Sequence, residues 1–449
     1  MSIAKESLQT DSLPSGPASK FTPRFDPERV SQMKEMLKLS SLPEASVQPL
    51  DDPESDIGIK LEFVAEAKAA LEAYDVEEFE RKLNKMNHFL APIEDVNLHF
   101  IHERSERPDA IPLLIIHGWP GAFYDFRKII DPLVHPTDPS QPAFHLVAPS
   151  LPGYAWSTSG NRFGSSEFSR CSSLLSEGQP SSLTFLLTLK TYIVDMARIF
   201  NKLMVEVLGY NKYVGQGGDW GGHIMRPLAL YHSDHMRLVH FNMFFCQPAE
   251  GIASYTPWLN HLPLPQSTVD WLSTQIKEWG VPEAQLRLLR QFQGFLTGGS
   301  GYVELQSTRP ATVGYAIASS PLSLLTYIGE KKLAWQDPAT FELDDLLATV
   351  SLYYLTSTFQ TSVMIYQQSL PRLRQILTDT SEAGKIKIPT AFSAFPYELE
   401  APPRDWIAQY VPLVQYRVHD KGGHFPAVEN PTGLVEDLQS FYGPRWKTA

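Results

Sequence analysis

The chain has few cysteines, no excess of positive charge and no long apolar run. Its 449 residues include two cysteines, Cys171 and Cys246, which cannot form a disulfide framework. Lys and Arg number 38 against 50 Asp and Glu, so the net charge of −12 leaves no basic surplus to neutralise nucleic-acid phosphates. No stretch reaches the roughly 18 apolar residues of a membrane span. We therefore expect neither nucleic acid nor a membrane as a partner.

The first 20 residues also lack the features of a targeting segment. They contain neither an apolar core nor an Arg-rich amphipathic pattern, and the carboxyl terminus is not a peroxisomal address. The single Asn-x-Thr pattern, at Asn430, is blocked by Pro431. We predict a mobile tail over residues 1–20 and a cytoplasmic protein.

Hydrophobic patterning predicts a helical leader followed by a sheet-forming core. Residues 21–95 read as an all-helical meander, in which Asp26 and Pro27 are typical of a helix start and a third helix is expected over residues 79–89. Short apolar runs then alternate with amphipathic helices such as residues 191–208, which indicates an α/β fold with a parallel sheet covered on both faces. The runs are 111–117, 144–150, 213–216, 237–245, 386–395 and 413–420.

Two segments interrupt this alternation. The core is expected in two parts, residues 96–245 and residues 371–449. Between them, residues 246–370 are helical in period and rich in aromatics, which predicts a helical lid carried on the sheet. Residues 161–182 are Ser-rich and without period, and we interpret them as a flexible insertion in the first part.

The stretch VGQGGDWGGH, residues 214–223, lies between an apolar run and a helical pattern. Asp219 stands at its centre, flanked by glycines. A strand, a glycine-flanked polar residue and a helix are typical of a nucleophile elbow, whose tight turn projects the central side chain beyond the sheet edge. One alternative is a phosphate-binding turn, but it would need a third glycine where Trp220 stands, and an acid would repel pyrophosphate. The other is a plain tight turn with a capping Asp.

A second turn, HGWP at residues 117–120, ends an apolar run. In hydrolases with a nucleophile elbow, the loop at this place supplies one backbone N–H of an oxyanion hole, and the residue after the nucleophile supplies the other. The two donors are then Trp119 and Trp220. His117 could be mistaken for a catalytic base, and we interpret it as a structural histidine that holds the turn.

The stretch HDKGGHF, near the carboxyl terminus, offers a base. His424 follows a late strand and two glycines, which is the expected place in the chain order nucleophile, acid, histidine. His419 lies within the strand pattern and ranks second. The acid should follow the preceding strand, where Glu398 is nearer to the strand end than Glu400 and Asp405.

Two histidine pairs, His99/His102 and His232/His235, have a spacing found among metal ligands. No Cys or carboxylate completes either set, so we predict no metal site and no cofactor.

An Asp at the elbow indicates which bond is broken. A carboxylate displaces at saturated carbon and leaves an alkyl ester on the enzyme. Water activated by His424 must then attack the carbonyl of that ester, and the oxyanion hole stabilises the tetrahedral state. Strained ethers and alkyl halides suit this chemistry, and an epoxide also needs a proton donor for its departing oxygen.

These motifs resemble those of the epoxide hydrolases of the α/β-hydrolase superfamily, and are most similar to the soluble fungal members of its microsomal-type branch. The resemblance runs from Phe21 to about Phe441 and includes HGWPGAF, PSLPGY, GGDWGG, STRPATVGYAIASSPLSLLTYIGEK and GGHF. It implies an α/β-hydrolase fold with a mostly parallel sheet, a helical lid and an N-terminal meander. The membrane anchor of the microsomal relatives is missing, which favours a soluble enzyme.

The resemblance also implies two lid tyrosines that bind and protonate the epoxide oxygen. They match Tyr302 and Tyr366, neither of which stands out among the 18 tyrosines on sequence alone. Glu398 matches the family's acid in its FPYEL context.

We therefore expect an epoxide hydrolase that converts a small apolar or aromatic epoxide and water into a vicinal diol, in detoxification or in secondary metabolism. One alternative is a hydrolase of the haloalkane dehalogenase type, which shares the Asp nucleophile. Another is a non-catalytic relative that binds a small apolar ligand. The oligomeric state is open, and a homodimer is a common outcome for such a surface.

Overall fold

The computed structural model describes residues 15–47, 57–160, 192–246, 291, 294–379, 381 and 383–447. The predicted insertion at 161–182, with Cys171, lies outside the described residues. So do residues 1–14 of the predicted tail and most of the first part of the predicted lid.

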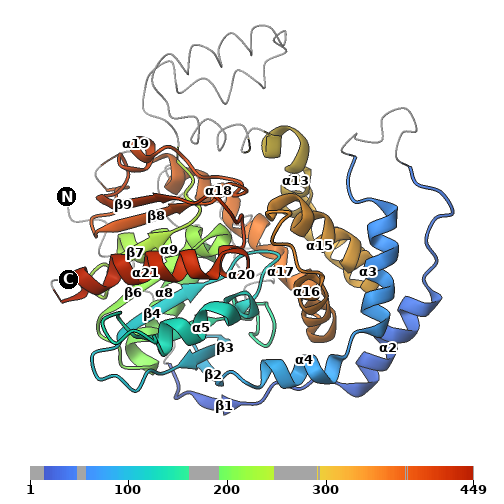
Figure 1. Ribbon diagram of the computed structural model, residues 1–449, viewed down its shortest axis with the longest axis horizontal. Helices are drawn as coiled ribbons and strands as arrows, with labels where there is room; N and C mark the ends of the chain where they lie inside the picture. Colours follow the sequence, from blue (N-terminus) through green and yellow to red (C-terminus); the bar gives the residue numbers. More distant parts are fainter. Residues whose placement is uncertain are drawn as a thin grey trace, which may run out of the picture.

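A nine-stranded, mostly parallel sheet forms the centre of the molecule (Figure 1). Its order is β1-β2-β3-β5-β4-β6-β7-β8-β9, with parallel pairing from β5 to β9 and antiparallel pairing from β1 to β5. All six residues of β4 are buried, as expected for a central strand covered on both faces. The strands are β1 (Ser19–Phe21), β2 (His88–Ile93), β3 (Val96–Glu103), β4 (Ile111–Ile116), β5 (Phe144–Pro149), β6 (Tyr213–Gly217), β7 (Met236–Phe241), β8 (Thr390–Ala394) and β9 (Leu413–Val418).

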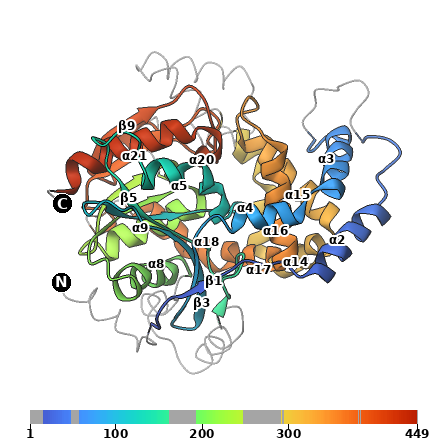
Figure 2. The same cartoon turned by 60° about the horizontal axis from the view of Figure 1, so that its bottom comes forward.

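Helices cover both faces of the sheet. On one face α5 (Arg127–Val134) and α21 (Pro431–Trp446) pack together, and on the other α8 (Tyr192–Lys202) packs beside α9 (Asp219–Tyr231) (Figures 1 and 2). The described parts of the parallel core thus have the layered α/β architecture that the alternating pattern predicts.

The helices of the lid lie to one side of the sheet, reached from the carboxyl end of β7 (Figure 1). The N-terminal helices α2 and α3 pack against the lid helices α15 and α16 and so support the lid from outside (Figure 2). The Arg29 side chain of α2 donates two hydrogen bonds to the carbonyl oxygen of Tyr354 in α16. The helices are α2 (Pro27–Leu39), α3 (Leu61–Ala73), α4 (Val76–Leu83), α13 (Gly301–Thr308), α14 (Pro310–Ala318), α15 (Pro321–Trp335), α16 (Leu343–Thr356), α17 (Phe359–Ser362) and α18 (Met364–Thr378).

Three predicted boundaries are wrong. Residues 15–20 are not a free tail, because β1 pairs with β2 and the N–H of Gly16 donates to Pro92. The third helix ends at Leu83 rather than at residue 89, and His88–Ile93 is a strand, so the leader is not all-helical. A tight turn between β2 and β3 supplies that strand with a partner, which local helix periodicity does not register. The predicted lid boundary at residue 370 falls inside α18.

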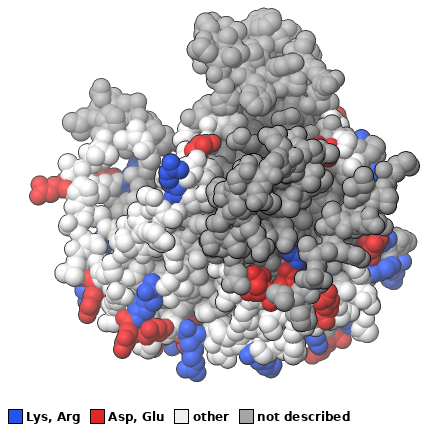
Figure 3. Space-filling view, turned by 180° about the vertical axis from the view of Figure 1, so that it is seen from behind, with Lys and Arg blue, Asp and Glu red and all other residues white. Residues whose placement is uncertain are grey.

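The described helices include no single one that is long and apolar enough to cross a membrane. Helices α14 and α15 together satisfy the length and composition criteria, but a bend of 117° separates them. On the face shown in Figure 3, the described residues along the lower edge carry acidic and basic side chains intermixed rather than in one patch of either sign. The expectation that nucleic acid is not a partner stays a prediction.

Candidate active site

Asp219 lies at the turn that joins β6 to α9. Its φ of +49° is left-handed, a conformation that costs a non-glycine residue roughly 1–3 kcal/mol. The flanking glycines allow the turn because they have no side chain. A Cβ on Gly217 would lie 2.6 Å from the backbone of Gly221. A Cβ on Gly118 would overlap the Asp219 carboxylate. The tight turn predicted from the sequence is present, and it presents the carboxylate at the carboxyl edge of the sheet.

Two backbone N–H groups stabilise the Asp219 carboxylate. Trp119 N–H donates to Oδ1 at 2.7 Å, and Trp220 N–H donates as well. Burial alone would raise the pKa of Asp219, but the facing His424 imidazolium and these two N–H groups outweigh it and hold the pKa below its ordinary value. The carboxylate is therefore ionised at neutral pH, as a nucleophile must be.

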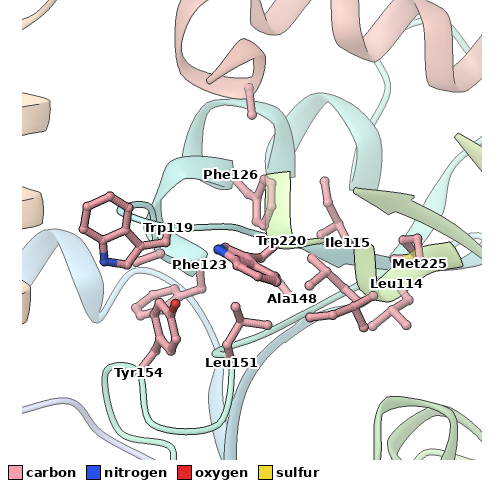
Figure 4. Packing of buried hydrophobic residues seen from close by; sticks show 14 of the residues in the cluster. Leu114, Ile115, Trp119, Phe123, Phe126, Ala148, Leu151, Tyr154, Trp220 and Met225 are labelled. Atoms are coloured by element: carbon pink, nitrogen blue, oxygen red, sulfur yellow. The ribbon is translucent and has the colours of Figure 1, made fainter. Parts of the chain in front are cut away.

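The side chains of Trp119 and Trp220 anchor these two donors in the core. Trp119 is fully buried and Trp220 nearly so. Figure 4 shows the Trp220 indole among Phe123, Phe126 and Ala148, with Trp119 to one side. Since packed indoles restrict movement of their own backbone, the two N–H groups are fixed before any reaction takes place.

His424 lies between two carboxylates. Its Nδ1 is 2.6 Å from Glu398 Oε1, and its Nε2 is 3.4 Å from Asp219 Oδ2. Burial alone would lower the pKa of His424, but the charges of Glu398 and Asp219 outweigh burial and raise the pKa to about 10. The histidine is thus an imidazolium in the resting site.

Glu398 follows β8 and is completely buried. Besides His424, it accepts hydrogen bonds from the N–H of Leu399 at 2.7 Å and from Asn242 Nδ2 at 3.1 Å. The two other candidate acids lie elsewhere. Glu400 makes no hydrogen bond to His424, and burial followed by the charge of Glu398 raises its pKa well above the ordinary value. Asp405 is exposed beside Arg404.

His117 and His419, the other histidines considered as a base, bind groups other than Asp219 and Glu398. His117 uses both ring nitrogens on backbone groups, the carbonyl of Gly118 at 2.9 Å and the N–H of Leu151 at 3.1 Å, so its role is to hold the turn. His419 Nε2 is 2.7 Å from Asp437 Oδ2, and its ring stacks on Phe395. No group of three potential metal ligands occurs among the described residues.

Tyr302 of α13 and Tyr366 of α18 meet above the two tryptophans, with ring centroids 5.8 Å apart. Tyr302 stacks on Trp119 at 5.3 Å, and Tyr366 makes an edge contact with Trp220 at 4.8 Å. Burial raises the pKa of both phenols well above 10.0, and the charge of Asp219 adds to the effect. Both tyrosines therefore stay protonated, and the structure brings them to the Asp219 side of the lid.

The end of lid helix α15 holds the backbone beside His424, which the sequence interpretation missed. The His424 N–H donates to the carbonyl of Trp335 at 3.0 Å, and the Gly422 N–H donates to Asp337 Oδ2 at 2.9 Å. The buried carboxylate of Glu429 in turn accepts from the N–H groups of Asp337 and Phe425, both at 2.7 Å. His424 is thus fixed by lid and core together.

Gln216 and Asn242 are further polar residues that the sequence interpretation missed. Gln216 Nε2 donates to Asn242 Oδ1 at 2.9 Å, and Asn242 Nδ2 donates to Glu398. A signal existed for Asn242, because it comes directly after β7 and the carboxyl ends of parallel strands meet at one sheet edge.

Two protein-family descriptions and several known proteins are similar to this chain. The description "Epoxide hydrolase N terminus" matches residues 18–126, and "alpha/beta hydrolase fold" matches residues 111–322. Epoxide hydrolase 1 of Sus scrofa is 32% identical over 383 residues, which cover 80% of this chain and 75% of that protein.

Solved structures agree with this similarity. The Aspergillus niger epoxide hydrolase has a TM-score of 0.75 at 30% identity, covering 96% of this chain and 97% of that one. The juvenile hormone epoxide hydrolase from the silkworm Bombyx mori has a TM-score of 0.76 at 26% identity, covering 96% and 95%. Sequence and fold together show that this chain belongs to the epoxide hydrolase family, on the α/β-hydrolase fold.

Proposed function

We propose that the chain converts an epoxide into a vicinal diol through an alkyl ester on Asp219. The observation that carries the proposal is a carboxylate at a nucleophile elbow, backed by the His424–Glu398 pair and faced by two buried phenols. In the first step Oδ2 of Asp219 attacks an epoxide carbon, the C–O bond breaks, and the departing oxygen takes a proton from Tyr302 or Tyr366.

The second step hydrolyses the ester. His424 removes a proton from water, and the hydroxide attacks Cγ of Asp219. The negative charge on Oδ1 is stabilised by the N–H groups of Trp119 and Trp220, the donors that already hold that carboxylate. When the tetrahedral state collapses, the diol oxygen leaves with a proton from His424, and Asp219 is left as the neutral acid. The proton of Asp219 then passes to His424, which restores the resting ion pair, and the proton that His424 released after the ester formed replaces the one given up by the tyrosine.

The charge of Asp219 couples the two steps. The pKa of His424 is raised to about 10 partly by the Asp219 carboxylate. Formation of the ester removes that charge, so the pKa of His424 must fall in the alkyl-enzyme. The histidine then loses its proton more readily and can act as a base at the step that needs one.

This coupling predicts different pH profiles for the two steps. Alkylation should stay constant down to about pH 4, because the pKa of Asp219 lies below its ordinary 3.8. Hydrolysis should rise with pH to a plateau whose midpoint lies well below 10, since only neutral His424 can accept a proton. Stopped-flow tryptophan fluorescence can follow both steps. A hydrolysis rate still rising at pH 10 would contradict the coupling.

Substitution of the lid tyrosines separates this reaction from dehalogenation, which has no use for a proton donor. We expect Tyr302→Phe and Tyr366→Phe each to slow alkylation by an epoxide by roughly 10- to 100-fold, and the double variant by more. The rate would be measured in a single turnover with styrene oxide. Tyr315→Phe, at a 70% exposed position on the same lid, is the matched control. Near-normal turnover of styrene oxide by the double variant would exclude the two phenols as the proton donors.

The walls around the tyrosines favour a small apolar or aromatic epoxide. Trp335 lies 5.4 Å from the Tyr302 ring, and Trp119, Tyr327 and Phe359 continue the aromatic surface. Formation of a diol from styrene oxide, quantified by chromatography, tests the proposed activity directly. A cytoplasmic location and a homodimer stay predictions.

A further inference from the structure

A cavity of about 40 Å³ lies next to Asp219 and His424. Its lining includes residues of the turn after β4, of β6 and of the helix that follows His424, together with Asn242, and neither lid tyrosine is among the lining residues. A single water needs roughly 10–15 Å³ and two to four polar partners, so the cavity has room for water but not for an epoxide.

Gln216 contributes an unused acceptor to this cavity. The side chain is 2% exposed, and its Oε1 makes no hydrogen bond among the described residues. The orientation of the amide is fixed by its neighbours. Glu398 accepts from Asn242 Nδ2, so Asn242 Oδ1 must accept, and Gln216 Nε2 must be the donor to it. Oε1 of Gln216 is thereby left as a free acceptor on the cavity wall.

His424 contributes the second unused acceptor. Its Nδ1 proton is held by Glu398, so in the neutral ring the buried Nε2 is the acceptor. In the resting site Nε2 lies 3.4 Å from Asp219 Oδ2, and formation of the ester removes the charge that it faces. Among the other polar lining residues, His117 binds two backbone groups and Asp125 accepts from the N–H of Ala122, whereas the buried Nε1 of Trp119 is a donor without a hydrogen bond.

We propose that this cavity holds the hydrolytic water and that Gln216 is a catalytic residue of the second step. The inference rests on the proposed ester on Asp219. A water that donates one hydrogen to Gln216 Oε1 and the other to His424 Nε2 has a lone pair free for Cγ of Asp219. His424 takes one proton, the new C–O bond forms at Cγ, and the second hydrogen stays on the oxygen as it attacks. Gln216 thus orients the water without exchanging a proton.

Replacement of Gln216 by Met tests the role of the acceptor. Alkylation by styrene oxide should stay within about threefold of wild type, while hydrolysis of the ester slows by roughly 10- to 100-fold, because the water loses one of its two anchors. Acid quenching followed by mass spectrometry would show the ester accumulating. Gln439→Met is the matched control, since Gln439 is also buried and lies in α21 outside the cavity lining.

A second variant reaches the same water without touching Gln216. Ala427 lines the cavity and is 4% exposed, so Ala427→Val places methyl groups in the space of the water. It should slow hydrolysis and spare alkylation, as Gln216→Met does. Loss of both steps to the same extent in both variants would mean a structural role and would overturn the inference.

The pH profile separates direct contact from an effect relayed through Asn242 and Glu398. If Gln216 holds the water, Gln216→Met lowers the plateau of hydrolysis and leaves its midpoint unchanged. A shifted midpoint would show that the His424–Glu398 pair has been disturbed, and would overturn the assignment. Wild-type hydrolysis by Gln216→Met would also overturn it. Absence of an ester in the wild type is a different result, because it refutes the proposed function itself.

Discussion

Replacement of Asp219 by Asn should abolish epoxide turnover, with kcat falling on the order of 10⁴-fold or more. The variant keeps the size and shape of the side chain, so the turn with its left-handed φ and its contact with Trp119 should persist. A neutral amide has no anionic oxygen to attack the epoxide carbon. The measurement is diol formation from styrene oxide under excess substrate.

The control for this variant is Asp234→Asn, which removes a carboxylate at an exposed position and should leave kcat unchanged. Thermal unfolding of both variants should match the wild type and so separate loss of chemistry from loss of fold. If Asp219→Asn retained a tenth of the wild-type rate, a carboxylate nucleophile at this position would be excluded.

Replacement of His424 by Gln should stop the reaction halfway. The first step needs the Asp219 carboxylate and a phenol, both of which remain, and the N–H groups of Trp119 and Trp220 still stabilise the carboxylate. The second step loses its base, which is worth roughly 10²- to 10⁴-fold. The protein should therefore gain the mass of one epoxide molecule, located by peptide mapping on Asp219.

His419→Gln is the matched control, because His419 was the second candidate base and pairs instead with Asp437. It should turn over without accumulating an ester. Two results would contradict the assignment of His424: unchanged turnover by His424→Gln, or complete loss of alkylation together with hydrolysis in a folded variant.

The sequence allowed prediction of those features that depend on short segments. The apolar runs predicted the parallel strands β4 to β9, and the glycines around Asp219 predicted its turn, because only small residues fit that close approach. The chain order of Asp219, Glu398 and His424 follows from the order of the strands that carry them. In the structure His424 lies within hydrogen-bond distance of Glu398 on one side and within ion-pair distance of Asp219 on the other.

Features that depend on packing between distant segments could not be predicted from local pattern. The first residues of β2, His88 and Phe89, were interpreted as the end of a helix, because the partner β3, and not local periodicity, makes this segment a strand. Tyr302 and Tyr366 lie 64 positions apart on separate lid helices, and only the family resemblance selected them. The contacts of Asp337 and Trp335 with the His424 loop likewise join the end of α15 to a segment over 80 residues later.

Gln216 illustrates a signal that was available but ambiguous. A polar residue inside an otherwise apolar run, three positions before Asp219, is unusual for a central strand. Periodicity does not say whether such a side chain meets a partner in the core or a cavity. That distinction needs Asn242 from the next strand and Glu398 from the one after it, which together orient the amide.

The most direct test of the account is a single turnover with enzyme in excess over styrene oxide in ¹⁸O-water, with the diol read by mass spectrometry. If the epoxide carbon bonds to Asp219 and water attacks Cγ, both oxygens of the first diol come from the epoxide and from the carboxylate. The account therefore predicts unlabelled diol, with the label retained on Asp219. Diol that carries ¹⁸O in the first turnover would show direct attack by water and would contradict the ester route.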